Sequence, residues 1–285
     1  MLYFCADDYG IAKESNIRIK ECIEKGTLNK VSVLPNGDLS GLKEHILSAN
    51  VTATLHLNLV EGYALSDAKD VNLLVTDSGQ FKYSFIGLFL LSISSKRKIL
   101  EKQLYKEIKA QIDFWKSQVG ADTPLFIDSH QHTHMIPLIF KTLMKVIKQE
   151  ELNVRYLRIP SEPVIPYLLA PSLYFTYGLS GIIKQWLLKF FNLINKKSFK
   201  KSKIKTAYFI GLMFSGKVTV EKIEKVLPHY LKIANKRGSD IEITLHPGFL
   251  EEQEDSISGT RSGFKKFYYS PWRKKEYDTA MNFRY

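Results

Sequence analysis

The sequence is poor in cysteine: Cys5 and Cys22 are the only two among 285 residues. Cys5 lies in an apolar run, Cys22 lies in a helical pattern, and no CxxC pair is present. These features predict two buried free thiols rather than a disulfide or a cysteine metal site. No charged segment followed by an apolar one opens the sequence, so we expect no secretory signal and a cytoplasmic, reducing location.

Long apolar runs are also missing. Phe85–Ile93 is apolar but too short to cross a bilayer. Val164–Ile183 carries no charge, but residues that break helices interrupt it, namely Pro166, Pro171, Gly178 and Gly181. We therefore expect no transmembrane helix.

Acidic residues are absent from Lys184–Lys205, which contains eight lysines. This one segment supplies most of the formal net charge of +12, and the remainder of the chain is only mildly basic. A protein that binds nucleic acid usually carries a broader basic surface. We therefore expect no nucleic-acid partner.

What the sequence does contain is typical of one globular α/β protein. Hydrophobic residues make up 45% and charged residues 25%, close to the average for globular domains. Short apolar runs alternate with helical patterns, which indicates parallel strands joined by helices. The runs that we interpret as strands are Leu2–Ala6, Lys30–Leu34, Val51–Leu59, Leu125–Ile127, Arg155–Ile159, Thr206–Ile210 and Ile241–Leu245.

About seven parallel strands in roughly 250 residues suit a (β/α) barrel. We expect a single domain over residues 1–285, with insertions at about 60–100 and 163–205, where the alternation of strands and helices is interrupted. The first insertion contains the apolar run Phe85–Ile93, for which a lid, a dimer face and a lipid contact all stay open.

Polar residues stand at the ends of several predicted strands. In parallel α/β folds the reactive side chains gather at the carboxyl ends of the strands. A barrel would therefore bring onto one rim residues that are distant in sequence. The residues in these positions are Asp7, Asp8, His56, His130, Arg158 and His246.

Three histidines, at positions 130, 132 and 134, directly follow the fourth predicted strand. In an extended chain they would alternate between two faces, so that one or two of them could reach a common ion. Imidazole nitrogens together with carboxylate oxygens suit zinc, manganese or a similar divalent ion. The histidine cluster therefore predicts a metal site.

The adjacent acids Asp7 and Asp8 have two interpretations. A pair of this kind is often a solvated turn or a helix cap. Here it follows an apolar strand, where one carboxylate could bind a metal while the other removes a proton from water.

Four sequence blocks together resemble the YdjC-like carbohydrate deacetylases, which include the ChbG and HpnK types. The blocks are ADDYG at 6–10, LHLNL at 55–59, DSHQHTH at 128–134 and HPG at 246–248. They occur in the order found in that family. Residues 60–100 and 163–205 carry little of the resemblance.

The resemblance implies a distorted (β/α) barrel of the glycoside hydrolase/deacetylase kind. It also implies a hydrolase that removes N-acetyl groups from an amino sugar, with one divalent ion. Mg²⁺ or Zn²⁺ is expected, and Mn²⁺ and Co²⁺ stay open. Seven residues take roles by this resemblance: Asp8, His56 and His130 as metal ligands, Asp7 as base, His246 as acid, and Arg158 and His132 as substrate-binding residues. For Arg158, a salt-bridged arginine inside the barrel is the alternative.

Residues 184–205 combine apolar and basic side chains. Leu187, Phe190, Phe191 and Ile194 repeat at helical spacing, and lysines lie off that stripe. An interfacial helix at the inner face of the membrane fits this pattern. A lid or a homodimer helix with a solvated basic loop fits it as well. An N-acetylated sugar or glycolipid is the expected substrate in either case.

Two other functions stay open. The first is a glycoside or phosphoester hydrolase on the same barrel, which would need a second acid at a suitable distance from Asp7. Glu61, Asp128 and Glu162 are the candidates for that acid. The second is a non-catalytic, membrane-associated carbohydrate-binding protein.

Overall fold

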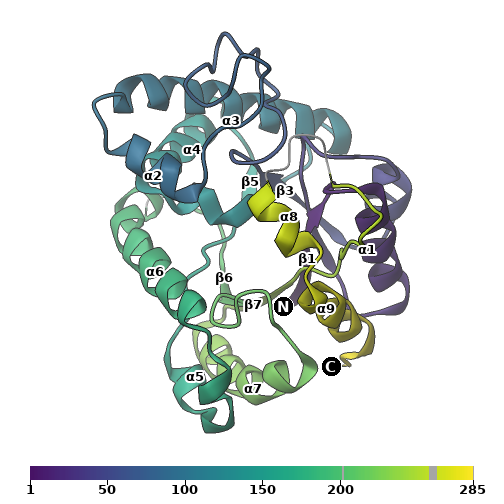
Figure 1. Ribbon diagram of the computed structural model, residues 1–285. Helices are drawn as coiled ribbons and strands as arrows, with labels where there is room; N and C mark the ends of the chain where they lie inside the picture. Colours follow the sequence, from purple (N-terminus) through teal and green to yellow (C-terminus); the bar gives the residue numbers. More distant parts are fainter. Residues whose placement is uncertain (201, 257–261, 285) are drawn as a thin grey trace.

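Seven parallel strands form one sheet in the order β5-β4-β3-β2-β1-β7-β6. The structure is a computed structural model that describes residues 1–200, 202–256 and 262–284. Figure 1 shows the strands in the centre of the molecule. Their bounds are Leu2–Tyr9 (β1), Lys30–Val33 (β2), Thr52–Leu57 (β3), Leu125–Ser129 (β4), Val154–Leu157 (β5), Ala207–Ile210 (β6) and Asp240–Leu245 (β7).

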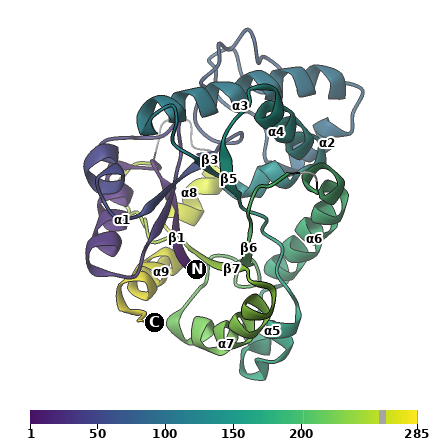
Figure 2. The same cartoon turned by 180° about the vertical axis from the view of Figure 1, so that it is seen from behind.

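Helices surround the sheet on all sides (Figures 1 and 2). The α-helices are Lys13–Lys25 (α1), Phe85–Ser92 (α2), Arg97–Val119 (α3), Pro137–Gln149 (α4), Ile165–Leu168 (α5), Leu179–Phe199 (α6), Val220–Arg237 (α7), Ser262–Tyr268 (α8) and Pro271–Asn282 (α9). Three shorter turns of other helix types complete the set: η1 (Lys43–Leu47), η2 (His130–Met135) and η3 (Pro171–Thr176). Among the described residues no helix is both long and apolar enough to cross a bilayer.

The sheet curls until its two edges meet. Tyr156 in β5 forms a parallel bridge with Lys205, just before β6. The Leu157 N–H donates to the Lys205 carbonyl at 3.0 Å, and the Lys205 N–H donates to the Arg155 carbonyl at 3.0 Å. The prediction of a distorted barrel of seven parallel strands is confirmed. The distortion lies at this seam, where one bridge replaces a full ladder.

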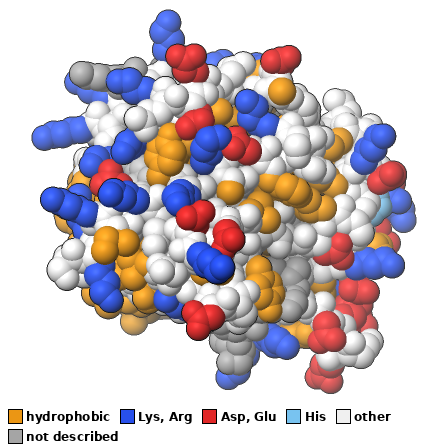
Figure 3. Space-filling view, turned by 90° about the horizontal axis from the view of Figure 1, so that it is seen from above, with side chains coloured by type: hydrophobic (Ala, Val, Ile, Leu, Met, Phe, Trp, Pro, Cys, Tyr) orange, Lys and Arg blue, Asp and Glu red, His pale blue; other side chains and the backbone are white. Residues whose placement is uncertain are grey.

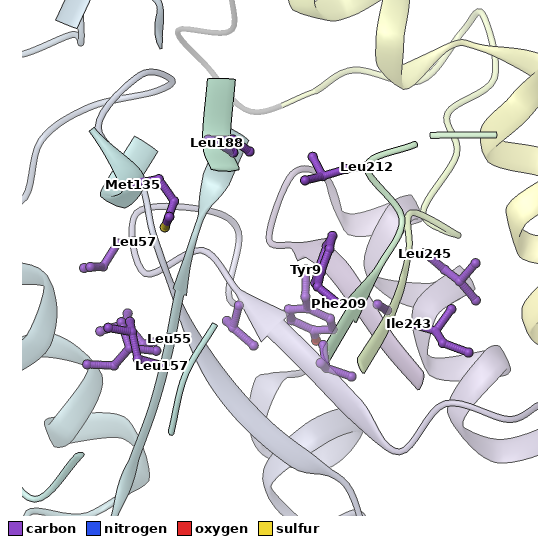
Figure 4. Close-up of a cluster of buried hydrophobic side chains, with 14 of the residues drawn as sticks. Tyr9, Leu55, Leu57, Met135, Leu157, Leu188, Phe209, Leu212, Ile243 and Leu245 are labelled. Atoms are coloured by element: carbon purple, nitrogen blue, oxygen red, sulfur yellow. The ribbon is translucent and has the colours of Figure 1, made fainter. Parts of the chain in front are cut away.

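The two faces of the curled sheet differ in polarity, because successive side chains along a strand point to opposite faces. Leu55, Ile127 and Leu157 form one row across β3, β4 and β5, and Figure 4 shows Leu55 and Leu157 close together in the apolar cluster. This face packs against the helices. The inner face instead carries ionised side chains that contact each other across strands that are not neighbours. The barrel interior is therefore polar.

The first strand is longer than the sequence predicts. We expected it to end at Ala6, with Asp7 and Asp8 in a polar turn, but β1 continues to Tyr9. That prediction is wrong because Tyr9 pairs with Val33 of β2 and keeps both acids inside the strand. The prediction for the cysteines is confirmed, since Cys5 and Cys22 are both free and buried.

The apolar stripe predicted for α6 is divided between the interior and the surface. Phe191 is buried, but Phe190 and Ile194 are exposed over 58% and 46% of their surface. Polar and small residues share the inner face of the helix with Leu188 and Phe191. Gln185 bonds to the backbone of Glu162, and Asn195 donates to the Met135 carbonyl at 2.8 Å. Lys201, within the basic tail predicted after this helix, lies outside the described residues.

Glu162 fastens the loop after β5 to the loop after β6. Its buried carboxylate accepts the N–H groups of Gly211, Leu212 and Met213 at 2.6, 2.8 and 3.0 Å. These donors have no strand partner at this point, so the carboxylate takes the place of a neighbouring strand. The segment that contains α5 and α6 begins at this clamp.

We expect Glu162→Ala to destabilise the protein by at least about 2 kcal/mol, because a buried donor without an acceptor costs about 1–3 kcal/mol. Urea unfolding followed by circular dichroism measures the change. Glu24→Ala, at an exposed position on α1, is the control and should change stability by no more than about 0.5 kcal/mol. Equal stability of the two variants would contradict the clamp.

Candidate active site

A β-bulge in β1 turns two adjacent carboxylates toward the same end of the barrel. Between Ala6 and Tyr9 the strand holds one residue more than the matching part of β2, and Asp8 has a φ of 72°. Adjacent strand residues normally face opposite sides, and a bulge re-aims one of them. Asp7 therefore contacts Arg158 inside the barrel, while Asp8 contacts His130.

Asp8, His56 and His130 form one of three buried groups among the described residues whose side chains could hold a metal ion. The Asp8 Oδ1 atom lies 2.8 Å from His130 Nδ1 and 3.5 Å from His56 Nε2. One ligand atom from each residue lies within 4.8 Å of the others, and all three side chains are buried. The structure thus brings together the three residues predicted as metal ligands, from β1, β3 and the start of η2.

The second nitrogen of each imidazole is held by a carboxylate. His56 Nδ1 lies 2.6 Å from Asp128 Oδ1, and His130 Nε2 lies 2.6 Å from Glu61 Oε2. Tyr268 donates its hydroxyl to the same oxygen of Glu61. Metal-binding histidines almost always donate their second N–H to such an acceptor, which fixes the ring and the tautomer. The nitrogens that remain, Nε2 of His56 and Nδ1 of His130, both face Asp8.

The cluster concentrates charge in a buried place. Burial disfavours the protonated form of His56, but Asp128 and Asp7 outweigh burial and raise its pKa to about 9. For His130, Asp8 and Glu61 outweigh burial in the same way and raise the pKa to about 10. Burial would raise the pKa of Asp8, but His130 and Arg273 hold it well below its usual value. One carboxylate and two fixed imidazoles are a donor set that fits a divalent cation, which would replace the protons.

Three buried polar atoms around the cluster have no hydrogen-bond partner among the described residues. They are Glu61 Oε1, His132 Nδ1 and Arg273 Nε. Buried polar atoms in proteins are nearly always hydrogen-bonded. Their presence at one end of the barrel therefore indicates a site for a polar ligand.

Arg158 is fully buried and bonds to acids from three strands. Its two terminal nitrogens donate to the two oxygens of Asp7 at 2.7 and 2.8 Å, and Nε donates to Glu242 at 2.8 Å. It also lies 2.8 Å from Asp128. Burial alone would raise the pKa of Asp7, but Arg158 outweighs it, so the pKa is lowered. These contacts match the alternative that the sequence left open, a salt-bridged arginine inside the barrel, and they also fix both oxygens of Asp7.

The histidines after β4 are not extended, so the predicted alternation is wrong. Residues 130–135 form a 3₁₀ turn in which Gln131 and His132 have φ values of 53° and 57°. His132 packs edge-on against Phe209, and burial together with Arg158 holds its pKa well below the usual value, so it is neutral. His134 bonds to Ser129 and to the Arg158 carbonyl, which makes it a support for the end of β5.

His246 lies after β7 and is partly exposed. Its backbone N–H donates to Glu276 Oε2 at 2.6 Å, and its Nδ1 lies 3.1 Å from the same oxygen. The side chain keeps 22% of its surface exposed and packs edge-on against Phe267. Because Nδ1 faces Glu276, Nε2 is the ring nitrogen available to a ligand.

The C-terminal helices α8 and α9 also supply side chains to the site, which the sequence did not indicate. Arg273 of α9 forms an ion pair with Asp8 Oδ2 and bonds to the Gly248 carbonyl at 3.2 Å. Tyr268 of α8 and Glu276 of α9 hold Glu61 and His246. Figure 1 shows α8 in front of the strands, with α9 beside it. These residues follow no strand, so strand-end reasoning gave no signal for them.

Comparison with known proteins identifies the family. The model of the YdjC-like protein family matches residues 1–283. The chain belongs to this family. The solved structure of a putative cellobiose-phosphate cleavage protein from Enterococcus faecalis has the same fold as this YdjC-like chain, with a TM-score of 0.67 and 18% identity over 99% of this chain and 90% of that one.

Curated relatives share parts of this YdjC-like chain. A carbohydrate deacetylase of Xenopus laevis is 28% identical over 163 residues, which are 56% of this chain and 51% of the relative. A carbohydrate deacetylase of Clostridium beijerinckii is 25% identical over 190 residues, 64% of this chain and 71% of the relative. A chitooligosaccharide deacetylase of Enterobacter sp. is 25% identical over 159 residues, which are 54% of this chain and 58% of the relative. The match thus spans about half the length of the Xenopus relative.

The buried charges of this YdjC-like barrel should make its stability depend on acid. Burial would raise the pKa of Glu242, but Arg158 and Lys30 outweigh it and lower the pKa. A lowered pKa in the folded state means that the ionised acid stabilises the fold above its unfolded pKa of about 4.5. This contribution is lost as the pH falls through the folded-state value.

We expect Glu242→Gln to cost about 3–5 kcal/mol at neutral pH, because it leaves Arg158 and Lys30 short of a buried partner. The difference from the unmodified protein should narrow as the pH falls below about 4.5 toward the lower folded-state pKa, because the acid is protonated first in the unfolded chain and then in the folded protein. Urea unfolding at neutral and acidic pH measures both effects. The control is Asp240→Asn, which lies on the same strand but in a surface ion pair. It should lower the free energy of unfolding by about 1 kcal/mol or less. A constant difference across pH would contradict the assignment.

Proposed function

We propose that this protein removes an N-acetyl group from an amino sugar, with one divalent ion held by Asp8, His56 and His130. The observation that carries the proposal is the pair of fixed imidazoles. Each has a carboxylate on its outer nitrogen, so that the inner nitrogens converge with Asp8 within 4.8 Å. The names of the relatives, carbohydrate deacetylase and chitooligosaccharide deacetylase, support the reaction and the substrate class.

The donor set is compatible with several divalent ions. Two imidazole nitrogens and one carboxylate oxygen suit Zn²⁺, and Mg²⁺ accepts such a site when water fills its other positions. Mn²⁺ and Co²⁺ belong to the same proposal. Arg273 holds Asp8 Oδ2, which leaves Oδ1 as the oxygen for the ion. A reducing, cytoplasmic location also belongs to the proposal, and the two free buried thiols support it.

Asp7 has the properties of the base in this reaction. A bound divalent ion supplies Lewis acidity, which makes a water molecule more acidic and the acetyl carbonyl more electrophilic. Asp7 is ionised at neutral pH because Arg158 lowers its pKa, and the same guanidinium fixes both of its oxygens. It can therefore take a proton from the water as the oxygen attacks the acetyl carbon.

His246 has the properties of the acid. The C–N bond breaks when the amine nitrogen receives a proton, and the products are acetate and the free amino sugar. Glu276 holds His246 Nδ1 at 3.1 Å and orients the ring, so that Nε2 can face the leaving nitrogen and donate to it. His132, neutral and with an unpaired Nδ1, is proposed to bind the sugar.

Glycoside hydrolysis is less well supported, because each candidate for a second acid has another task. Asp128 bonds to His56, Ser32 and Arg158. Glu162 holds three backbone N–H groups of the loop after β6. Glu61 bonds to His130 and Tyr268 through one oxygen. None of the three is placed as a solvent-facing acid beside Asp7.

Substitution of Asp7 should separate catalysis from metal binding. We expect Asp7→Asn to release acetate from short N-acetylglucosamine oligomers at least about 100-fold more slowly, because a base contributes about 10²–10⁴-fold. Its metal content should stay near that of the unmodified protein, whereas His56→Ala should lose both metal and activity. Acetate assays and elemental analysis, with chelator and with metal added back, measure the two properties. An Asp7→Asn variant with full activity would exclude Asp7 as the base.

The carboxylates behind the histidines should tune metal affinity. We expect Asp128→Asn and Glu61→Gln each to bind the ion about 10–100-fold more weakly, because each removes the acceptor that fixes an imidazole. Competition with a fluorescent chelator measures the affinity. Glu107→Gln, a buried acid that holds backbone N–H groups of residues 65 and 66, is the matched control and should bind as tightly as the unmodified protein. Unchanged affinity in Asp128→Asn would place the ion elsewhere.

A further inference from the structure

One side of the molecule exposes an unusual number of large apolar side chains. They come from α2 and from the segment that contains α5, η3 and α6, and several are exposed over more than half of their surface. We call this surface the α2–α6 face. Its exposed apolar residues are Ile86, Leu90, Ile93, Ile165, Leu168, Leu169, Tyr174, Phe175, Leu179, Ile183, Trp186, Phe190, Leu193 and Ile194.

Within this face, α2 and α6 pack side by side. The rings of Phe85 and Phe89 lie 6.4 and 5.2 Å from the ring of Phe191. Along α6 the exposed stripe Leu179, Ile183, Trp186, Phe190 and Leu193 advances by four and three residues in turn. That spacing keeps the side chains on one side of a helix. Contiguous apolar surface of this extent marks an interaction site.

The same face is basic and contains no acid. No Asp or Glu occurs in the sequence between Asp77 and Glu101, or between Glu162 and Glu221. Lys96, Arg97 and Lys98 are exposed directly after α2, and α6 adds four lysines at 184, 189, 196 and 197. Figure 3 shows many blue basic side chains close to orange apolar ones on the left of the view, the side on which Figure 1 places α2 and α6.

We propose that the α2–α6 face binds the surface of a membrane that contains anionic lipids. Exposed Trp and Phe side chains beside lysines are typical of helices that lie in the lipid interface. Lysines near an anionic surface add attraction that salt screens. The face would lie on the bilayer rather than cross it.

A second copy of the chain is a poorer occupant. In a two-fold dimer the same patch meets itself. The lysines of one α2–α6 face would then approach the lysines of the other, with no acid on either side to pair them. A surface of negative lipid headgroups satisfies both the charge and the apolar side chains.

Vesicle co-sedimentation tests the proposal with the full chain and does not depend on any enzymatic activity. We expect the protein to sediment with vesicles of phosphatidylglycerol and phosphatidylcholine, less with phosphatidylcholine alone, and less as salt is raised. Lys98→Glu with Lys189→Glu should weaken binding by about tenfold or more, because each reversal removes one attraction and adds one repulsion. Trp186→Gln with Phe190→Gln should weaken it by a similar factor.

Matched controls lie on α1, away from the face. The charge control is Lys13→Glu with Lys20→Glu, which, like the lysine test pair, changes one lysine in a first helical turn and one in the middle of a helix. The apolar control is Ile17→Gln, which changes an exposed apolar residue. These controls should sediment like the unmodified protein. Absence of binding to anionic vesicles, or equal binding of test and control variants, would overturn the proposal. A stable dimer that becomes monomeric only in Trp186→Gln with Phe190→Gln would also overturn it, in favour of a second copy.

Discussion

The ionic contacts of Arg158 inside the barrel hold the site together. A guanidinium without solvent exposure joins Asp7 of β1, Asp128 of β4 and Glu242 of β7. Three carboxylates this close would repel each other, and one or more would take up a proton. The cation keeps them ionised. A lysine could not replace Arg158, because a single ammonium group cannot donate to several carboxylates in the fixed planar arrangement of a guanidinium.

The effect of Arg158 reaches the metal site through Asp128. One oxygen of Asp128 holds His56 Nδ1, and the carboxylate also lies against Arg158. The orientation of the His56 ring therefore depends on a guanidinium that does not touch it. Arg158 fixes Asp7 directly and His56 through Asp128, so the proposed base and one proposed ligand share a single support. This arrangement requires charged side chains inside the barrel, where apolar ones would otherwise pack.

The sequence predicted the regular parts of this structure better than the irregular ones. All seven apolar runs are strands, because apolar alternation and strand-end position are local properties that a sequence displays. The bulge at Asp8 and the left-handed turn at Gln131 and His132 were not predicted. Such conformations cost energy locally and persist when surrounding contacts fix them. Those contacts come from residues far away in sequence, such as Arg273 and Tyr268, whose positions no local pattern reveals.

Helix α6 shows how the site also shapes the outside of the molecule. Gln185 and Asn195 turn inward because the loops after β5 and β4 offer the Glu162 and Met135 carbonyls there, and Gly181 lets the helix approach residues 212 and 213 closely. With these small and polar residues on its inner side, the helix has more apolar residues than its buried face accepts. The surplus faces outward, beside its lysines. Apolar spacing alone does not show which side of α6 faces the barrel, because it ignores hydrogen bonds that only the folded barrel provides.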